Sequence, residues 1–194
     1  MNPADLNAET LVLAYQQGVF PMPDPDSGEI HFYQPHMRAI IPLNSFHVSQ
    51  SLKRRINKAD YQVQIDSDFS GVMRHCANRP ETWITDDFIR AYGELHQAGL
   101  AHSLEVYMHG NIVGGVYGVT LGAAFFAESM FHIVTDMSKI ALYHLVCHLH
   151  ARQFQMLECQ FLTTHLASLG AIEISHTTYL ARLDECLASD TRIF

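Results

Sequence analysis

The stretch from residue 102 to residue 131, HSLEVYMHGNIVGGVYGVTLGAAFFAESMF, constrains the fold of this chain more than any other. Apolar and polar residues alternate along it, and HGN and LG interrupt the alternation at two points. A period of two with short turn signals is typical of strands joined by tight turns. The stretch therefore predicts three antiparallel strands, whose glycines let another strand or a ligand approach the backbone closely.

Helices and one more strand are expected around this meander. MLECQFL, at 156–162, predicts a strand. Segments with helical spacing or capping residues predict helices at 7–18, 45–58, 86–98, 135–153, 163–170 and 177–188. A meander followed by a helix, a strand and further helices predicts the α+β class, with a mixed sheet flanked by helices.

Proline marks a boundary near the start of the chain. Five of the seven prolines lie between Pro21 and Pro42. Proline fixes its own φ and restricts the residue before it, so this segment predicts turns and extended backbone. We therefore expect a short N-terminal lobe at 1–43 and a main domain at 44–194.

The charge balance bears on possible partners. Twelve Lys and Arg face twenty Asp and Glu, and the net charge of −8 argues against a polyanion as partner. SLKRRINK is a local exception, because four basic residues fall within positions 53–58. A solvated helix face explains it simply, but basic residues with aromatics nearby are also the usual composition of a site for a nucleic-acid end. Both interpretations stay open on these residues alone.

Cysteine usage and hydropathy indicate a cytoplasmic protein that does not enter a membrane. The four cysteines form no CxxC pair, which predicts free thiols, and the first residues lack the positive charge of a signal peptide. The run 112–127, which lacks charged, His and Asn side chains, has 16 residues, fewer than the roughly 20 that span a bilayer. His144 and His148 are four apart, but without an HExxH acid they favour a solvated polar face over a metal site.

The LECQF segment carries the first candidate chemistry. In a strand, Glu158 and Gln160 would share one face about 7 Å apart, with Cys159 packed inertly on the other. Such a carboxylate and amide can orient a nucleophile or bind a proton at a cleft. A strand with one wet face is the plainer alternative.

A second acid lies in the AFFAESMF segment. Alternation would place Phe126, Glu128 and Met130 on one strand face. If this strand is a neighbour of LECQF, then Glu128, Glu158 and Gln160 line one pocket, and two acids in a pocket suit a cationic ligand.

Several blocks together resemble a known family. They are AYQQGVFPMPD, PHMRAIIP, SQSLKRRINK, TWIT, AYGELHQAGLAHSLEVY, GGVYGVTLGAAFFAESMF, DMSKIAL and LECQFLTTHLASLGA. In this order they resemble the characteristic blocks of the leucyl/phenylalanyl-tRNA-protein transferase family. The resemblance implies a GNAT-like (acyl-CoA N-acyltransferase-like) domain without a cofactor. It would act as a monomer that moves Leu or Phe, with Met as a further candidate, from aminoacyl-tRNA to proteins with N-terminal Arg or Lys, forming a peptide bond that marks them for degradation.

The resemblance also implies roles for individual residues. Glu158, where the family usually has Asp, and Gln160 would be the catalytic pair. Glu128 would be a third catalytic residue, at a pocket position where it holds the cationic acceptor. Trp83 and Tyr33, the latter where the family usually has Trp, would form a platform for the terminal adenosine. The implied substrate-binding positions are Tyr15, Tyr33, Trp83, Tyr92, Val116, Ser129, Met130 and Cys159, and the implied tRNA-binding positions are Lys53, Arg54 and Lys58.

Two other functions remain in view. An acetyl-CoA-dependent N-acetyltransferase of the same fold would need a glycine-containing turn for pyrophosphate, and FHIVTDMSKIAL has no glycine there. A tRNA-end-binding module with impaired catalysis would keep the basic helix and the aromatics. Peptide-bond formation distinguishes the transferase from both alternatives.

Overall fold

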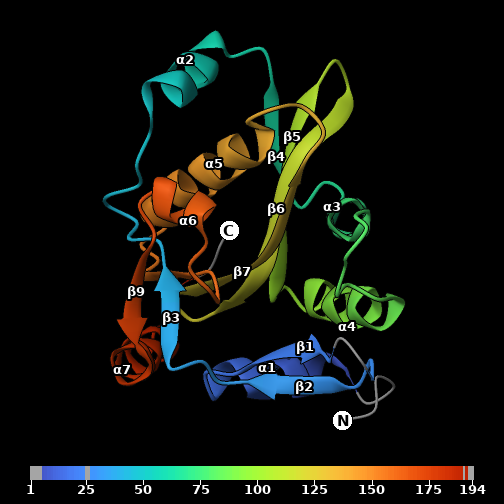
Figure 1. Ribbon diagram of the computed structural model, residues 1–194, viewed down its shortest axis with the longest axis vertical. Coiled ribbons are helices and arrows are strands. Elements are labelled where there is room, and N and C mark those ends of the chain that lie inside the picture. Colours follow the sequence, from blue (N-terminus) through green and yellow to red (C-terminus); the bar gives the residue numbers. More distant parts are fainter. Residues whose placement is uncertain (1–5, 25–26, 190, 192–194) are drawn as a thin grey trace.

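A seven-stranded mixed sheet organises the chain (Figure 1). The computed structural model describes residues 6–24, 27–189 and 191. The elements in chain order are α1 (Ala8–Gln16), β1 (Phe20–Pro23), β2 (Ile30–Tyr33), β3 (Met37–Ile40), α2 (Gln50–Lys58), β4 (Gln62–Ile65), α3 (Phe69–Ala77), α4 (Asp86–Gln97), β5 (Ala101–Met108), β6 (Asn111–Leu121), β7 (Ala124–His132), α5 (Met137–Ala151), β8 (Met156–Glu158), α6 (Thr164–Ser168), β9 (Ile172–Ser175) and α7 (His176–Leu187).

The strand order is β4-β5-β6-β7-β8-β3-β9. β7 and β8 run parallel, and every other recorded pairing is antiparallel. The predicted meander is β5-β6-β7, and the predicted α+β class with a mixed sheet flanked by helices is confirmed. None of the helices in the described part of the chain has the length and apolar character needed to span a bilayer.

Helices cover both faces of the sheet. One apolar cluster packs α1, α3 and α4 against it, and a second packs α5 against the other face, as Figure 1 shows. An added Cβ at Gly114 would lie 2.5 Å from the Cβ of Met137, so the glycine lets the start of α5 approach β6. The glycine permits a close approach, but the partner is a helix and not the strand or ligand that was expected.

The N-terminal segment contains more regular structure than its prolines predict. α1 begins at a capping box in which Asn7 and Thr10 bond each other's backbone, as the predicted cap requires. The proline-rich segment forms the β1–β2 hairpin and then β3, which pairs with β8 and β9 inside the main sheet. β4 and β9 are absent from the prediction, because strands of four residues carry little periodicity. α3, a helix of nine residues, is absent from it as well. The helix expected at 45–58 begins only at Gln50, after the Ser49 cap.

Candidate active site

A cleft opens where β7 and β8 separate. Phe126 and Glu158 are the last pair in their parallel register. β8 ends at Glu158, and Gln160 takes a left-handed conformation with φ of 55°. The predicted strand at 156–162 is therefore too long, and its alternation of Glu158 and Gln160 on one face is wrong.

A β-bulge aims Glu128 at this opening. Tyr117 pairs with Ser129 and Gly118 with Ala127, which leaves Glu128 as the extra residue on β7. The bulge reverses the alternation, so Phe126 packs in the cluster with α1 while Met130 packs in the cluster with α5. The expectation that Phe126, Glu128 and Met130 share a face is wrong for this reason.

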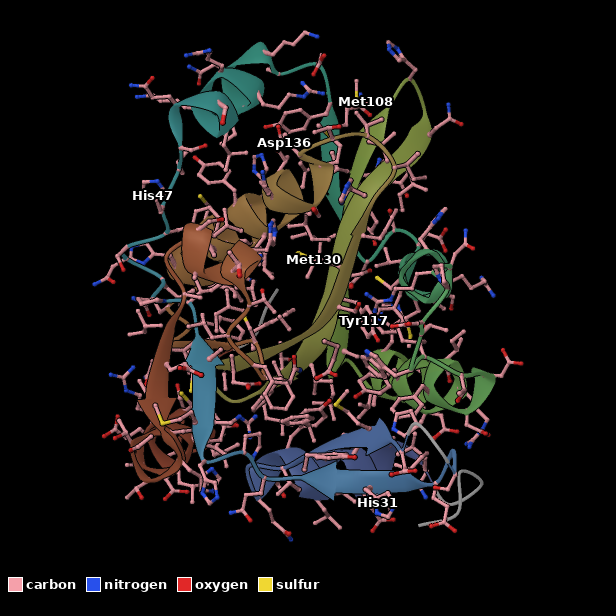
Figure 2. All side chains as sticks on the ribbon, in the orientation of Figure 1. His31, His47, Met108, Tyr117, Met130 and Asp136 are labelled. Carbon is pink, nitrogen blue, oxygen red and sulfur yellow. The ribbon has the colours of Figure 1, made fainter. Side chains whose placement is uncertain are left out.

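The cleft has a volume of about 510 Å³. Figure 2 shows Met130 beside α6 and Tyr117 on the side of α3 and α4. The lining comes from β1, the 79–83 segment, β7 and the chain after β8, and comprises Phe20, Pro21, Met22, Arg79, Trp83, Glu128, Ser129, Met130, Cys159, Gln160, Phe161, Thr163, His165 and Leu166. An adjoining apolar recess of about 90 Å³ shares several of these residues and adds Val116, Ala127 and Leu142.

Three donors hold the Glu128 carboxylate. Tyr15 donates to Oε1 at 2.6 Å, Tyr92 donates to Oε2 at 3.2 Å, and the Gln160 side-chain amide donates to Oε1 at 3.1 Å. Burial raises the pKa of Glu128 to about 7, although the bonds from Tyr15 and Tyr92 act to lower it. This carboxyl group therefore changes charge near neutral pH.

Glu158 lies behind the cleft in a buried ion pair. Its Oε1 accepts from Arg38 Nε at 3.0 Å and lies 2.8 Å from Nη2, and both side chains are fully buried. Burial raises the pKa of Glu158, while Arg38 acts to lower it. Among the described residues, Glu158 Oε2 has no hydrogen-bond partner.

Gln160 links the two acids. Its backbone N–H donates to Glu158 Oε1 at 2.6 Å, while its side chain donates to Glu128. Gln160 and Glu128 line the cleft, whereas Glu158 does not. The structure thus brings all three predicted residues together but places only two of them where a ligand can touch them.

The predicted substrate positions divide into three groups. Trp83, Ser129, Met130 and Cys159 line the cleft, and Val116 lines the recess. Tyr15 and Tyr92 are buried behind Glu128. Tyr33 is absent from the cleft lining and stacks on Phe20 with ring centroids 6.3 Å apart. Cys159 is buried, and burial raises the pKa of its thiol well above the ordinary value, as inert packing predicts.

The predicted tRNA-binding residues lie on α2, at the opposite end of the molecule from the α1, β1 and β2 lobe (Figure 1). All three side chains are exposed, and Lys58 also pairs with Asp60 at 2.8 Å. The neighbouring Arg55 also pairs with Asp60. These two cations lower the pKa of Asp60 to about 2. Within the described chain, α2 therefore presents Lys53 and Arg54 as its cations outside the ion pairs with Asp60.

Two arginines of the site were not singled out from the sequence. Arg38 is fully buried between the rings of Phe20 and Tyr179, at 4.9 and 4.2 Å, and donates to Gly18 O at 2.5 Å. A lone arginine within the apolar run MRAII signals a buried charge that needs a partner. Arg79 lines the cleft in a segment whose sequence contains no such signal.

Comparisons with known proteins show which family the chain resembles over most of its length. A family model described as leucyl/phenylalanyl-tRNA protein transferase matches residues 40–184, and the model of its N-terminal domain matches residues 4–36. A leucyl/phenylalanyl-tRNA–protein transferase from Cereibacter sphaeroides is 52% identical over 96% of this chain and 88% of its own. One from Chlorobium luteolum is 41% identical over 94% of this chain and 96% of its own. The crystal structure of FemX shares the fold, with a TM-score of 0.57 at 12% identity over 74% of this chain and 60% of its own.

Proposed function

This chain belongs to the leucyl/phenylalanyl-tRNA–protein transferase family, and from that premise we propose how its cleft transfers an amino acid from tRNA to a protein. The contact between Gln160 and Glu128 at the mouth of the apolar recess supports the proposal most directly. The acyl donor is leucyl- or phenylalanyl-tRNA, and the acceptor is a protein with N-terminal Arg or Lys.

The recess receives the side chain of the donor amino acid. Val116, Met130, Leu142 and Leu166 give it an apolar wall, which suits Leu, Phe or Met and disfavours a charged side chain. Trp83, in the wider cleft, provides an aromatic face for the terminal adenine.

The reaction is aminolysis of an ester. The neutral α-amine of the acceptor attacks the aminoacyl carbonyl carbon, a C–N bond forms, and the bond from that carbon to the ribose oxygen breaks. The amine loses one proton and the leaving ribose oxygen gains one. The side-chain Oε1 of Gln160 accepts an N–H of the attacking amine, because its Nε2 is already engaged by Glu128.

Glu158 acts through Gln160 and is a positioning residue. Its Oε1 holds the Gln160 N–H in the left-handed turn that points the amide into the cleft. Most of the rate then comes from holding amine and carbonyl side by side, where an error of 1 Å costs about 10²-fold.

Glu128 recognises the acceptor. An ionised carboxylate at the cleft attracts the cationic N-terminal residue, and its two tyrosine partners fix its position. Replacing Glu128 by Gln should therefore raise KM for a peptide with N-terminal Arg more than KM for leucyl-tRNA.

The decisive assay is transfer of labelled leucine from leucyl-tRNA to a peptide with N-terminal Arg. Gln160→Ala should lower kcat by about 10² or more while the Kd for leucyl-tRNA stays unchanged. Glu158→Gln should act in the same direction, and Gln97→Ala, an exposed amide at the end of α4, is the matched control. If the folded wild-type protein binds tRNA but forms no peptide, the impaired binding module is the correct function. Tight acetyl-CoA binding would instead favour the acetyltransferase.

We assign the described residues up to Tyr33 to a lobe that closes one side of the cleft. The boundary expected at residue 43 would place β3 in this lobe, although β3 pairs with β8 and β9 in the main sheet, to which we assign the transfer chemistry. Phe20, Pro21 and Met22 on the lining and the Tyr15 bond to Glu128 support this division. The protein acts as a monomer in the cytoplasm, where aminoacyl-tRNA is made. Light scattering at micromolar protein concentration measures the molar mass in solution and so tests whether the protein is a monomer.

A further inference from the structure

Arg79 occupies a distinctive position in the cleft. It lies between α3 and α4, is exposed, and is the only lysine or arginine among the described residues that line the cleft. Trp83 lines the same cleft four residues later on the same segment. A cation and an aromatic face are thus presented together to a ligand.

The Arg79 guanidinium is oriented but not neutralised. Its Nη2 donates to Ser129 Oγ at 3.1 Å, and Ser129 follows Glu128 on β7. The ion pairs recorded among the described residues leave Arg79 without a carboxylate partner. A guanidinium has five N–H donors in a planar fork, so one bond to Ser129 leaves donors for an anion.

We infer that Arg79 binds the 5′-phosphate of the terminal nucleoside of the donor. The inference rests on the proposed function and adds a residue that contacts the tRNA. In an aminoacyl-tRNA the terminal ribose carries the amino acid on one side and the phosphodiester to the previous nucleotide on its 5′ side. With the aminoacyl carbonyl at Gln160 and the base on Trp83, the phosphate leaves the cleft beside the segment that carries Arg79.

The charges of the cleft divide between the two substrates. Glu128 is the only carboxylate on the described lining, and it repels a phosphate while it attracts the acceptor cation. Arg79 does the reverse, because it attracts phosphate by bidentate hydrogen bonding and repels an N-terminal Arg or Lys. The pair therefore assigns donor and acceptor to different parts of the cleft.

The experiment measures binding of two unreactive donor analogues to the full chain by calorimetry. Both are 3′-deoxy-3′-leucylamido-adenosine, one with a free 5′-hydroxyl and one with a 5′-phosphate. The proteins are wild type, Arg79→Gln, Arg79→Lys and the control Arg74→Gln, which removes an exposed arginine of α3 outside the cleft lining.

In the wild type, the 5′-phosphate should tighten binding roughly ten- to a hundred-fold, the usual effect of a hydrogen bond to a charged group. Arg79→Gln should remove this advantage and leave the Kd of the unphosphorylated analogue within about two-fold. Arg79→Lys should keep part of the advantage, since an ammonium keeps the charge without the planar fork. Arg74→Gln should behave as wild type.

Equal binding of the two analogues by the wild type would overturn the inference. So would an equal loss with both analogues in Arg79→Gln, which would make Arg79 a support for Ser129 only. The leucine-transfer assay is separate, so wild type that transfers leucine but gains nothing from the phosphate refutes the role of Arg79 alone. Wild type that binds neither analogue counts against the proposed function itself.

Discussion

Replacing Arg38 by Met tests whether the buried ion pair holds the site together. Arg38 and Glu158 are both fully buried, and the guanidinium also bonds Gly18 O and lies against two aromatic rings. Removing one partner of such a pair leaves an uncompensated buried charge and costs about 3–5 kcal/mol. Since domains are stable by only about 5–15 kcal/mol, we expect Arg38→Met to lose about a fifth or more of the free energy of unfolding.

The matched variants are Glu158→Gln and the double variant. In the double variant no charge is buried, so its loss of stability should be smaller than the sum of the single losses by about 1–3 kcal/mol. Urea unfolding followed by circular dichroism measures the free energy of unfolding of the two single variants and of the double variant. We expect all three to share one slope of this free energy against urea concentration. A loss below about 1 kcal/mol for Arg38→Met, or strict additivity in the double variant, would refute the role assigned to the pair.

Three further outcomes are expected. The pKa of Glu128 in the folded chain is about 7, above its ordinary 4.5, so between these pH values the folded chain binds a proton that the unfolded chain has lost. The free energy of unfolding should therefore fall by up to about 3 kcal/mol as pH rises from 4.5 to 7. Glu128→Gln should flatten that part of a urea-unfolding pH series. Gly118→Ala should lose about 1–3 kcal/mol in urea unfolding, because an added Cβ would overlap a carbonyl oxygen of β7 at the bulge. Changing Lys53 and Arg54 together to Gln should reduce the slope of log Kd for tRNA against log salt by about 1.5, with Arg74→Gln as the control.

The sequence predicts the elements that repeat a pattern over many residues. β5, β6 and β7 have eight, eleven and nine residues, and α5 has fifteen with a buried stripe that includes Leu142, Leu145 and Leu149. α5 buries a stripe at helical spacing, whereas β5 and β6 are buried along most of their length, and the turn signals HGN and LG mark where these strands end. β3 and β9 have four residues each, too few for alternation to be distinguished from chance.

The candidate site is predicted only in part, because its geometry depends on irregularities and distant partners. Glu128, Glu158 and Gln160 were expected in one pocket, and they are close together. A bulge of one residue at Glu128 and a left-handed residue at Gln160 have no period, so both strand alternations were wrong. Arg38 and Glu158 are 120 positions apart in the chain, and no local pattern joins them.

The same irregularities explain where the cleft lies and how a glutamate at 158 fits it. β7 and β8 stay paired up to Phe126 and Glu158, and beyond that point the bulge and the left-handed turn carry them apart. A longer β8 would close this gap with backbone hydrogen bonds. Glu158 faces Arg38 behind the cleft, so the extra methylene relative to aspartate displaces its carboxylate within a buried ion pair and not against the reacting atoms. Its effect on catalysis is therefore limited to how well it holds the Gln160 N–H.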